Sequence, residues 1–220
     1  MSKYKVIFIG NSYTYYNDMP SVFSDIAASM GYEVEVCSVT KGGEKLLGHV
    51  DEKGETYPQI LAELKKSRFD FAVLQEQSIR PVIDPPLFFD GGKRLSELLS
   101  DRVDRLVLYA TWARRWDSGF YSEHPMTVSE MTEKLDSAYS ALGEMISAKV
   151  SHVGRSFERV GSDALYDADA SHPSYLGSCL AALVLARTVL EVSDREIAAI
   201  SRIGELSDAE TELIKKAVTG

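Results

Sequence analysis

Two short segments near opposite ends of the chain carry residue types that together suit nucleophilic catalysis. Ser12 lies in the run Gly-Asn-Ser-Tyr-Thr at residues 10–14, and Asp169 and His172 stand three residues apart near the other end. A serine hydroxyl is a weak nucleophile until a base takes its proton, and the base keeps its tautomer when a third group holds its other ring nitrogen. Ser12, His172 and Asp169 could therefore act as nucleophile, base and orienting acid.

Each segment taken alone also has a simpler interpretation. A serine in a tight turn commonly hydrogen-bonds the backbone, and Asp169 or Ser171 could cap the helix predicted to follow. Residues 11–14 could instead cradle a phosphate or a flavin, although such loops normally contain more glycine, which lets the backbone amides approach the anion. Only the combination of the two segments favours catalysis over these alternatives.

Five β-rich runs are spaced along the sequence so that they could position these residues. Several of the runs are nearly continuously apolar, which is typical of parallel strands that are covered on both faces. The expected strands span Lys5–Ile9, Val34–Val39, Phe71–Gln75, Leu106–Ala110 and Lys149–Val153. Ser12 thus directly follows the first strand, and we expect it to project at the strand's carboxyl end.

Helical patterns separate the expected strands. Apolar residues recur at helical spacing within 18–31, 60–64, 95–99 and 128–145, and 175–190 is apolar almost all round, as in a helix buried against a sheet. The stretch 197–218 predicts a surface helical tail. The Pro- and Gly-rich stretch 81–92 predicts a long active-site loop.

The alternation of strands and helices predicts an α/β fold with a doubly wound, five-stranded parallel sheet. We find no internal repeat and no linker, so residues 1–220 are expected to form a single domain. Ligands of such folds bind beyond the carboxyl ends of the strands. The functional residues should therefore lie in the loops that follow the strands.

The two segments resemble the SGNH, or GDSL-like, hydrolase superfamily, in which a nucleophile block follows the first strand and an Asp-x-x-His block lies near the C-terminus. The resemblance implies a three-layer α/β/α sandwich of the flavodoxin-like type. It also implies that Ser12 is the nucleophile, His172 the general base and Asp169 its orienting acid, and that no cofactor is needed.

The family's middle blocks provide two further donors to the oxyanion hole, a glycine amide after the second strand and an asparagine side chain after the third. Gly43 fits the first, with Gly42 as the alternative. The third strand is followed by Gln-Glu-Gln-Ser, so the resemblance places Gln75 in the role of the asparagine, with Gln77 as the alternative. The expected oxyanion hole thus consists of the amides of Ser12 and Gly43 and the side chain of Gln75.

These residues predict a carboxylic ester hydrolase. The Gln-Glu pair resembles branches of the superfamily that deacetylate carbohydrates, so a small-molecule ester or an acetylated sugar is the expected substrate. Trp112 and Trp116 follow the fourth strand and could wall a substrate pocket, although Trp112 suits packing between sheet and helix equally well. Because the third block departs from the family's pattern, a non-catalytic carbohydrate- or ligand-binding module on the same fold remains the alternative.

Composition narrows the partners further. A formal net charge of −9 disfavours nucleic acid and anionic membranes as partners. The hydrophobic content of 45% is enough for the chain to form a buried core. His49, His124 and His152 show no metal-ligand spacing, so we expect no metal site. The apolar run Val6–Ile9 is too short for a signal peptide or a membrane span, which favours a cytoplasmic protein. The oligomeric state stays open.

Overall fold

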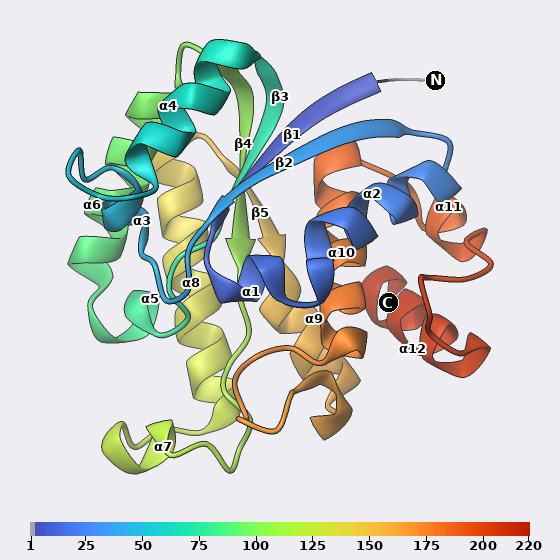
Figure 1. Cartoon of the computed structure of the whole chain (residues 1–220). Coiled ribbons are helices and arrows are strands. Elements are labelled where there is room, and N and C mark those ends of the chain that lie inside the picture. The colour runs from blue at the N-terminus through green and yellow to red at the C-terminus, as the bar shows by residue number, and fades with distance from the viewer. Residues whose placement is uncertain (1–2) are drawn as a thin grey trace.

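A five-stranded parallel sheet forms the centre of the computed structural model, which describes residues 3–220 (Figure 1). Its strands are β1 (Lys3–Gly10), β2 (Glu33–Thr40), β3 (Phe69–Leu74), β4 (Val103–Ala110) and β5 (Lys149–His152). The order across the sheet is β2-β1-β3-β4-β5, and every neighbouring pair is parallel. This order confirms the predicted flavodoxin-like, doubly wound sheet.

Helices cover both faces of the sheet and complete three layers (Figure 1). One face packs against α2 (Met19–Ser29), α9 (Val153–Val160), α10 (Tyr175–Leu190) and α12 (Asp208–Thr219). The other packs against α4 (Tyr57–Lys66), α6 (Pro85–Leu99) and α8 (Val128–Ile146). Because side chains alternate along a strand, Val6 and Phe8 of β1 join the first layer, while Ile7 and Ile9 join the second.

Short helices occupy the loops around this framework. They are α1 (Ser12–Tyr15), α3 (Leu46–His49), α5 (Arg80–Ile83), α7 (Phe120–Glu123) and α11 (Asp194–Ala198), with single 3₁₀ turns at Tyr16–Asp18 and Asp163–Leu165. None of the helices within residues 3–220 is long and apolar enough to cross a bilayer.

The stretch 81–92 is helical, so the prediction of a long active-site loop there was wrong. Pro85 is the first residue of α6, a position where its missing N–H costs nothing. The two glycines lie inside α6 because neighbouring elements pack closely there. A Cβ atom on Gly91 would lie 2.8 Å from the amide nitrogen of Leu47, and one on Gly92 would lie 2.5 Å from Leu142 Cδ2.

The C-terminal tail is helical and lies at the surface, as predicted, but one side of it packs into the core. Gly204, with φ of 51°, stands in the segment between α11 and α12. Ile197, Ile203 and Ile214 are each at most 1% exposed and belong to the apolar cluster around α10. The tail therefore extends the helical layer on that face.

Candidate active site

A sharp turn at the carboxyl end of β1 positions Ser12. Asn11 caps α1, because its Oδ1 accepts the amide of Tyr13 at 3.1 Å and leaves Ser12 as the first helical residue. Gly10 has no room for a side chain, since a Cβ atom there would lie 2.5 Å from Thr14 Oγ1 and 2.7 Å from Gln75 Oε1. Ser12 is 9% exposed.

The structure brings Ser12 together with the distant Asp169 and His172. Ser12 Oγ lies 2.8 Å from His172 Nε2, and His172 Nδ1 is hydrogen-bonded to Asp169 Oδ2. The other carboxylate oxygen, Asp169 Oδ1, accepts the amides of Ser171 at 3.0 Å and His172 at 2.8 Å. The three-residue spacing thus lets one carboxylate fix both the loop and the ring.

This hydrogen bonding also sets the charge of the carboxylate. Burial alone would raise the pKa of Asp169, but the hydrogen bonds from the His172 side chain and from the two amides outweigh it and hold the pKa below its usual range. Asp169 is therefore an anion at neutral pH, and its charge would stabilise a protonated His172.

Aromatic rings support the His172 ring on two sides. Tyr16 stacks on it with ring centroids 4.3 Å apart, and Tyr13 meets it edge-on at 5.4 Å. The Tyr13 hydroxyl also lies 2.8 Å from Ser171 Oγ, next to His172 in the chain. Sequence reasoning missed the role of Tyr16, which follows the end of α1 and lies in the adjoining 3₁₀ turn, where no local pattern indicates a contact with His172.

Trp112 has no exposed surface, so the prediction that it contacts substrate was wrong. Its ring is stacked between Tyr13, at 4.6 Å, and Phe157 of α9, at 4.1 Å. Its Nε1 donates to the carbonyl of Ser171 at 3.1 Å. Trp112 instead fills the gap between sheet and helix, and it supports the loop that carries His172.

Trp116 is the more accessible of the two tryptophans, with 68% of its surface exposed. Its Nε1 donates to Asp163 at 3.2 Å, and the ring borders a hollow of about 170 Å³. The amide of the preceding Arg115 donates to the carbonyl of Ala170 at 3.0 Å, which ties this segment to the loop of Asp169 and His172.

The glycine pair after β2 lies beside the nucleophile. Gly43 has φ of 66°, in the left-handed region, within a turn that the Glu44 amide closes by donating to the carbonyl of Lys41 at 3.1 Å. Asn11 Nδ2 donates to the carbonyl of Glu44 at 2.9 Å and so joins this turn to the nucleophile segment. The amides of Gly42 and Gly43 have no acceptor within residues 3–220.

Gln75 does not fit its predicted role as a donor to the oxyanion, because its side chain is 0% exposed. Its Oε1 accepts the Asn11 amide at 2.9 Å and the Thr14 hydroxyl at 2.8 Å, while its Nε2 donates to the carbonyl of Glu76. Since an amide N–H needs an acceptor, Oε1 must face Asn11. Gln75 thus anchors the nucleophile turn to the end of β3.

Gln77, the alternative, is differently placed. Its Oε1 accepts the amides of Ile79 at 3.2 Å and Arg80 at 3.1 Å, which fixes the orientation of the side chain. Its Nε2 has no acceptor among the described residues, and the side chain is only partly buried. Of the two glutamines, Gln77 is the one with a free donor.

The hydrogen bonds of the turn also bear on the phosphate- or flavin-binding alternative. The amide of Tyr13 donates to its Asn11 cap, and the amides of Thr14 and Tyr15 donate to the Asn11 carbonyl. Within the segment 12–15 only the Ser12 amide is left without an acceptor in the described chain. One amide is suited to an oxyanion but is a poor cradle for a phosphate.

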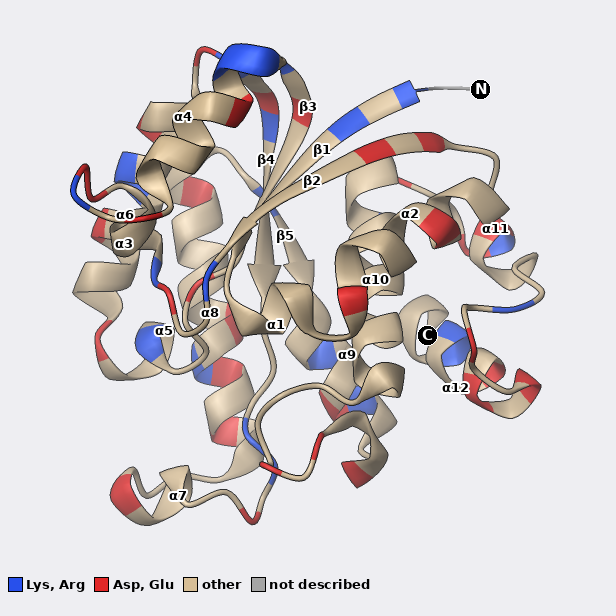
Figure 2. Ribbon diagram, in the orientation of Figure 1, with Lys and Arg blue, Asp and Glu red and all other residues tan. Residues whose placement is uncertain are grey.

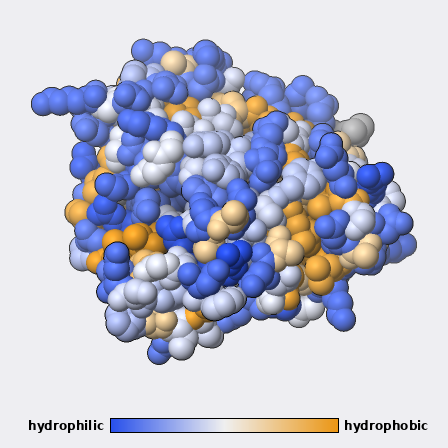
Figure 3. Space-filling model, turned by 60° about the horizontal axis from the view of Figure 1, so that its bottom comes forward, coloured by the Kyte–Doolittle hydropathy of each residue, from blue (hydrophilic) through white to orange (hydrophobic). Residues whose placement is uncertain are grey.

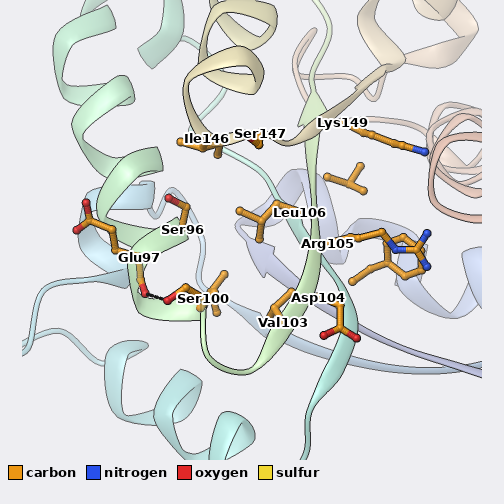
Figure 4. A pocket seen from close by; sticks show the side chains of 13 residues that line it. Ser96, Glu97, Ser100, Val103, Asp104, Arg105, Leu106, Ile146, Ser147 and Lys149 are labelled. Carbon is orange, nitrogen blue, oxygen red and sulfur yellow. Dashed lines mark hydrogen bonds between the residues drawn. The ribbon is translucent and has the colours of Figure 1, made fainter.

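Figure 3 turns the carboxyl edge of the sheet toward the viewer and shows a largely hydrophilic face with apolar patches at its sides. A hollow of about 620 Å³ lies at the other end of the sheet, where β4 and β5 begin and α6 and α8 end (Figure 4). Leu106, Ile146 and Lys149 are among its lining residues, and Ser12, Asp169 and His172 are not.

Comparison with solved structures relates this architecture to known proteins. A protein of Slackia heliotrinireducens described as an SGNH hydrolase is 30% identical, with a TM-score of 0.76 over 85% of this chain and 99% of the other. A DUF4886 family protein from Bacteroides uniformis is 15% identical, with a TM-score of 0.79 over 99% and 93% of the two chains.

An acetylxylan esterase from Geobacillus stearothermophilus is also similar in fold. It is 14% identical, with a TM-score of 0.59 over 86% of this chain and 95% of the esterase. No family model matches the chain, and no curated protein matches it either. The likeness to the Bacteroides and Geobacillus proteins concerns the fold.

Proposed function

Because the chain belongs to the SGNH hydrolase superfamily, we propose that it hydrolyses carboxylic esters with Ser12 as nucleophile, His172 as general base and Asp169 as orienting acid. The hydrogen-bonded chain from Ser12 Oγ through His172 to Asp169 carries the proposal. Its order is the one that a serine nucleophile requires.

The proposed reaction has two halves. Ser12 Oγ attacks the ester carbonyl while its proton passes to His172 Nε2, and His172 then gives that proton to the departing alcohol oxygen, which leaves an acyl group on Ser12. In the second half a water molecule attacks the acyl carbonyl and gives a proton to His172. The carboxylic acid leaves as the proton returns to Ser12 Oγ.

The amides of Ser12 and Gly43 and the Gln77 side chain form the proposed oxyanion hole. Each has an N–H without an acceptor in the described chain, and all three follow strand ends at the same edge of the sheet. Donors fixed in advance around a developing negative charge usually contribute the largest single share of rate enhancement. Gln77 takes the role first expected of Gln75, which is committed to the Asn11 amide.

Acetylated sugars are the proposed substrate class among small esters. The acetylxylan esterase of similar fold supports this choice, as does the exposed Trp116 ring beside the loop of His172. Aromatic faces pack well against the apolar faces of sugar rings.

A hydrolysis screen tests the proposal. Wild-type protein is incubated with p-nitrophenyl esters from acetate to octanoate and with acetylated xylose and glucose, beside a Ser12→Ala control. We expect the highest kcat/KM for acetyl esters and release of acetate from at least one sugar. Equal rates for wild type and Ser12→Ala would refute catalysis by Ser12, and no hydrolysis at all would favour a non-catalytic binding module.

A further inference from the structure

Arg114, in the loop that follows β4, is a partly buried cation at the catalytic edge, and no carboxylate of residues 3–220 forms an ion pair with it. The neighbouring Arg115 differs in this respect, since its Nε lies 2.7 Å from Asp117. Figure 2 shows the basic segment of this loop on the side of the molecule where the strands end. Other cations of the chain also lack a carboxylate partner, but among residues 3–220 only Arg114 combines this lack with a buried, unpaired guanidinium nitrogen.

The guanidinium group of Arg114 has an incomplete set of hydrogen bonds. Its Nη2 donates to Ser78 Oγ at 2.9 Å, whereas its Nε is buried and has no acceptor in the described chain. Its Nη1 also has no acceptor in the described chain, but unlike Nε it is accessible to solvent. Removing a charged group from water is costly unless an opposite charge pairs with it.

The surroundings of Arg114 offer no spare anion. The Arg114 charge acts on the buried Tyr13 and on Tyr121, where it opposes the rise in pKa that burial causes. Asp169 also acts on Tyr13, but both of its oxygens already accept hydrogen bonds from the Ser171–His172 segment. An anion that pairs with Arg114 would therefore have to come from outside the described chain.

Hydrogen bonds of Arg114 and of its neighbours in the chain place it near the catalytic segments. Ser78, which accepts from Arg114, directly follows Gln77, and Tyr13 directly follows Ser12. Trp112 and Arg115, on the two sides of Arg114, donate to carbonyls of the loop that carries His172. The guanidinium thus lies between the end of β3 and the catalytic loop, where it would meet one end of a bound ester.

We propose that Arg114 binds an anionic group of the substrate, so that the enzyme prefers esters that carry a carboxylate near the scissile bond. This inference rests on the proposed ester hydrolysis. The N–H groups of Nη1 would donate to the carboxylate, and a hydrogen bond between charged groups is about twice as strong as a neutral one. The carboxylate could belong to the acyl part of the ester or to the alcohol part.

Two matched substrate pairs distinguish these sources. The monoanionic p-nitrophenyl glutarate is compared with neutral p-nitrophenyl pentanoate for the acyl side, and 4-acetoxybenzoate with 4-acetoxybenzamide for the alcohol side. We expect wild-type kcat/KM to favour the anion in one pair, and Arg114→Gln to lower that ratio about tenfold to a hundredfold, as charged hydrogen bonds imply. The ratio for Arg114→Lys, which retains the charge, should lie between those of the wild type and Arg114→Gln.

Arg115→Gln is the control, because Arg115 is paired with Asp117, and it should leave the ratio unchanged. A wild type that prefers neither anion, or an unchanged ratio in folded Arg114→Gln, would overturn the inference. Cleavage of the neutral esters without anion preference would refute only the role of Arg114, whereas failure to cleave any ester would refute the proposed function.

Inhibition of the wild type serves as a second measurement that does not depend on the folding of a variant. Glutarate and 4-hydroxybenzoate should compete with p-nitrophenyl acetate more strongly than glutaramide and 4-hydroxybenzamide do. The advantage should shrink as salt screens the charge. Equal inhibition by acids and amides in both pairs would contradict the inference.

Discussion

At the scale of single residues, the division of labour between His172 and Asp169 can be measured. Among residues 3–220, His172 is the one base hydrogen-bonded to Ser12 Oγ, so His172→Ala should lower kcat by about 10⁶-fold. Asp169→Asn should lower it by about 10⁴-fold, because a poorly oriented base still accepts protons. Steady-state kinetics on p-nitrophenyl acetate gives both values. Wild-type turnover in His172→Ala would exclude His172 as the base.

Substitution of the two glutamines after β3 should have different effects, mainly on kcat for Gln77 and mainly on stability for Gln75. Gln77→Ala removes a donor to the oxyanion and should lower kcat about 10²- to 10³-fold, with a modest fall in Tm because the amides of Ile79 and Arg80 lose Oε1 as acceptor. Gln75→Ala leaves the buried Asn11 amide without its acceptor, so it should lower the free energy of unfolding by about 1–3 kcal/mol.

Thermal melts and kcat measured on the same two preparations separate these effects. If Gln75→Ala kept full stability and lost kcat while Gln77→Ala kept it, Gln75 would be the donor after all. If neither variant changed kcat, the two backbone amides of Ser12 and Gly43 would suffice to stabilise the oxyanion.

Ser12 and the Asp169–His172 pair could be predicted from the sequence because Ser12 directly follows an expected strand and the pair closely precedes an expected buried helix. The sequence cannot separate Gln75 from Gln77, since β3 ends at Leu74 and the regular alternation of side chains ends with it. Trp112 poses a similar problem. An aromatic residue after a strand can line a pocket or fill a gap, and only the partners Tyr13 and Phe157 decide between them.

At the scale of elements, the carboxylate of Glu76 joins the end of β3 to the start of α3. It accepts the amide of Gln77 at 2.6 Å and that of Leu46 at 3.4 Å, and it is 1% exposed. Burial raises its pKa to about 7, although both amides oppose the shift. In the unfolded chain the same group titrates near 4.5. Glu76 therefore takes up a proton on folding when the pH lies between these two values.

The raised pKa fixes the direction of the effect on stability. Between pH 4.5 and about 7 the folded state holds a proton on Glu76 that the unfolded state has lost, so stability falls as pH rises through this window and then levels off. Glu76→Gln cannot titrate. The Tm of Glu76→Gln minus that of wild type should therefore increase from pH 5 to pH 8.

Melts of the two proteins at matched ionic strength check this result. A constant difference in Tm across the range would mean that Glu76 titrates alike in the folded and unfolded states. A difference that decreased with pH would indicate a lowered pKa, contrary to the burial of this side chain.

Among the elements, the buried ones were the most predictable. The five strands follow from β-rich runs, several of them nearly continuously apolar, and α10 follows from a long apolar run. The first part of α6 was mistaken for a loop because proline and glycine also mark loops. Pro85 instead begins a helix, and Gly91 and Gly92 allow close packing on Leu47 and Leu142. That packing depends on residues distant in sequence, so no local pattern could reveal it.

At the scale of the whole molecule, the two ends of the sheet should behave independently. The proposed chemistry is confined to the carboxyl end, and the hollow at the amino end borders Ser147, the residue that ends α8 with φ of 54° and ψ of 39° (Figure 4). Glycine tolerates this left-handed conformation better than serine, so Ser147→Gly should raise the free energy of unfolding by about 0.5–1 kcal/mol.

Denaturant unfolding gives the stability of Ser147→Gly, and its kcat/KM on p-nitrophenyl acetate should equal that of the wild type, because distant sites contribute additively. A clear change in kcat/KM would show that the two ends of the sheet are coupled.

The overall architecture was predictable from the order of strands and helices. The packing of the C-terminal tail against α10 was not, because the apolar residues of the tail indicate a surface helix without indicating which element its apolar face contacts.

Covalent labelling tests directly whether Ser12 is the catalytic nucleophile. Intact wild-type protein is treated with a fluorophosphonate, and the modified residue is located by mass spectrometry, with folded Ser12→Ala as the control. We expect one phosphonyl group on Ser12, loss of esterase activity in step with labelling, and no adduct in Ser12→Ala. An adduct on a different residue that accompanies the loss of activity, or undiminished ester hydrolysis by Ser12→Ala, would contradict this role of Ser12.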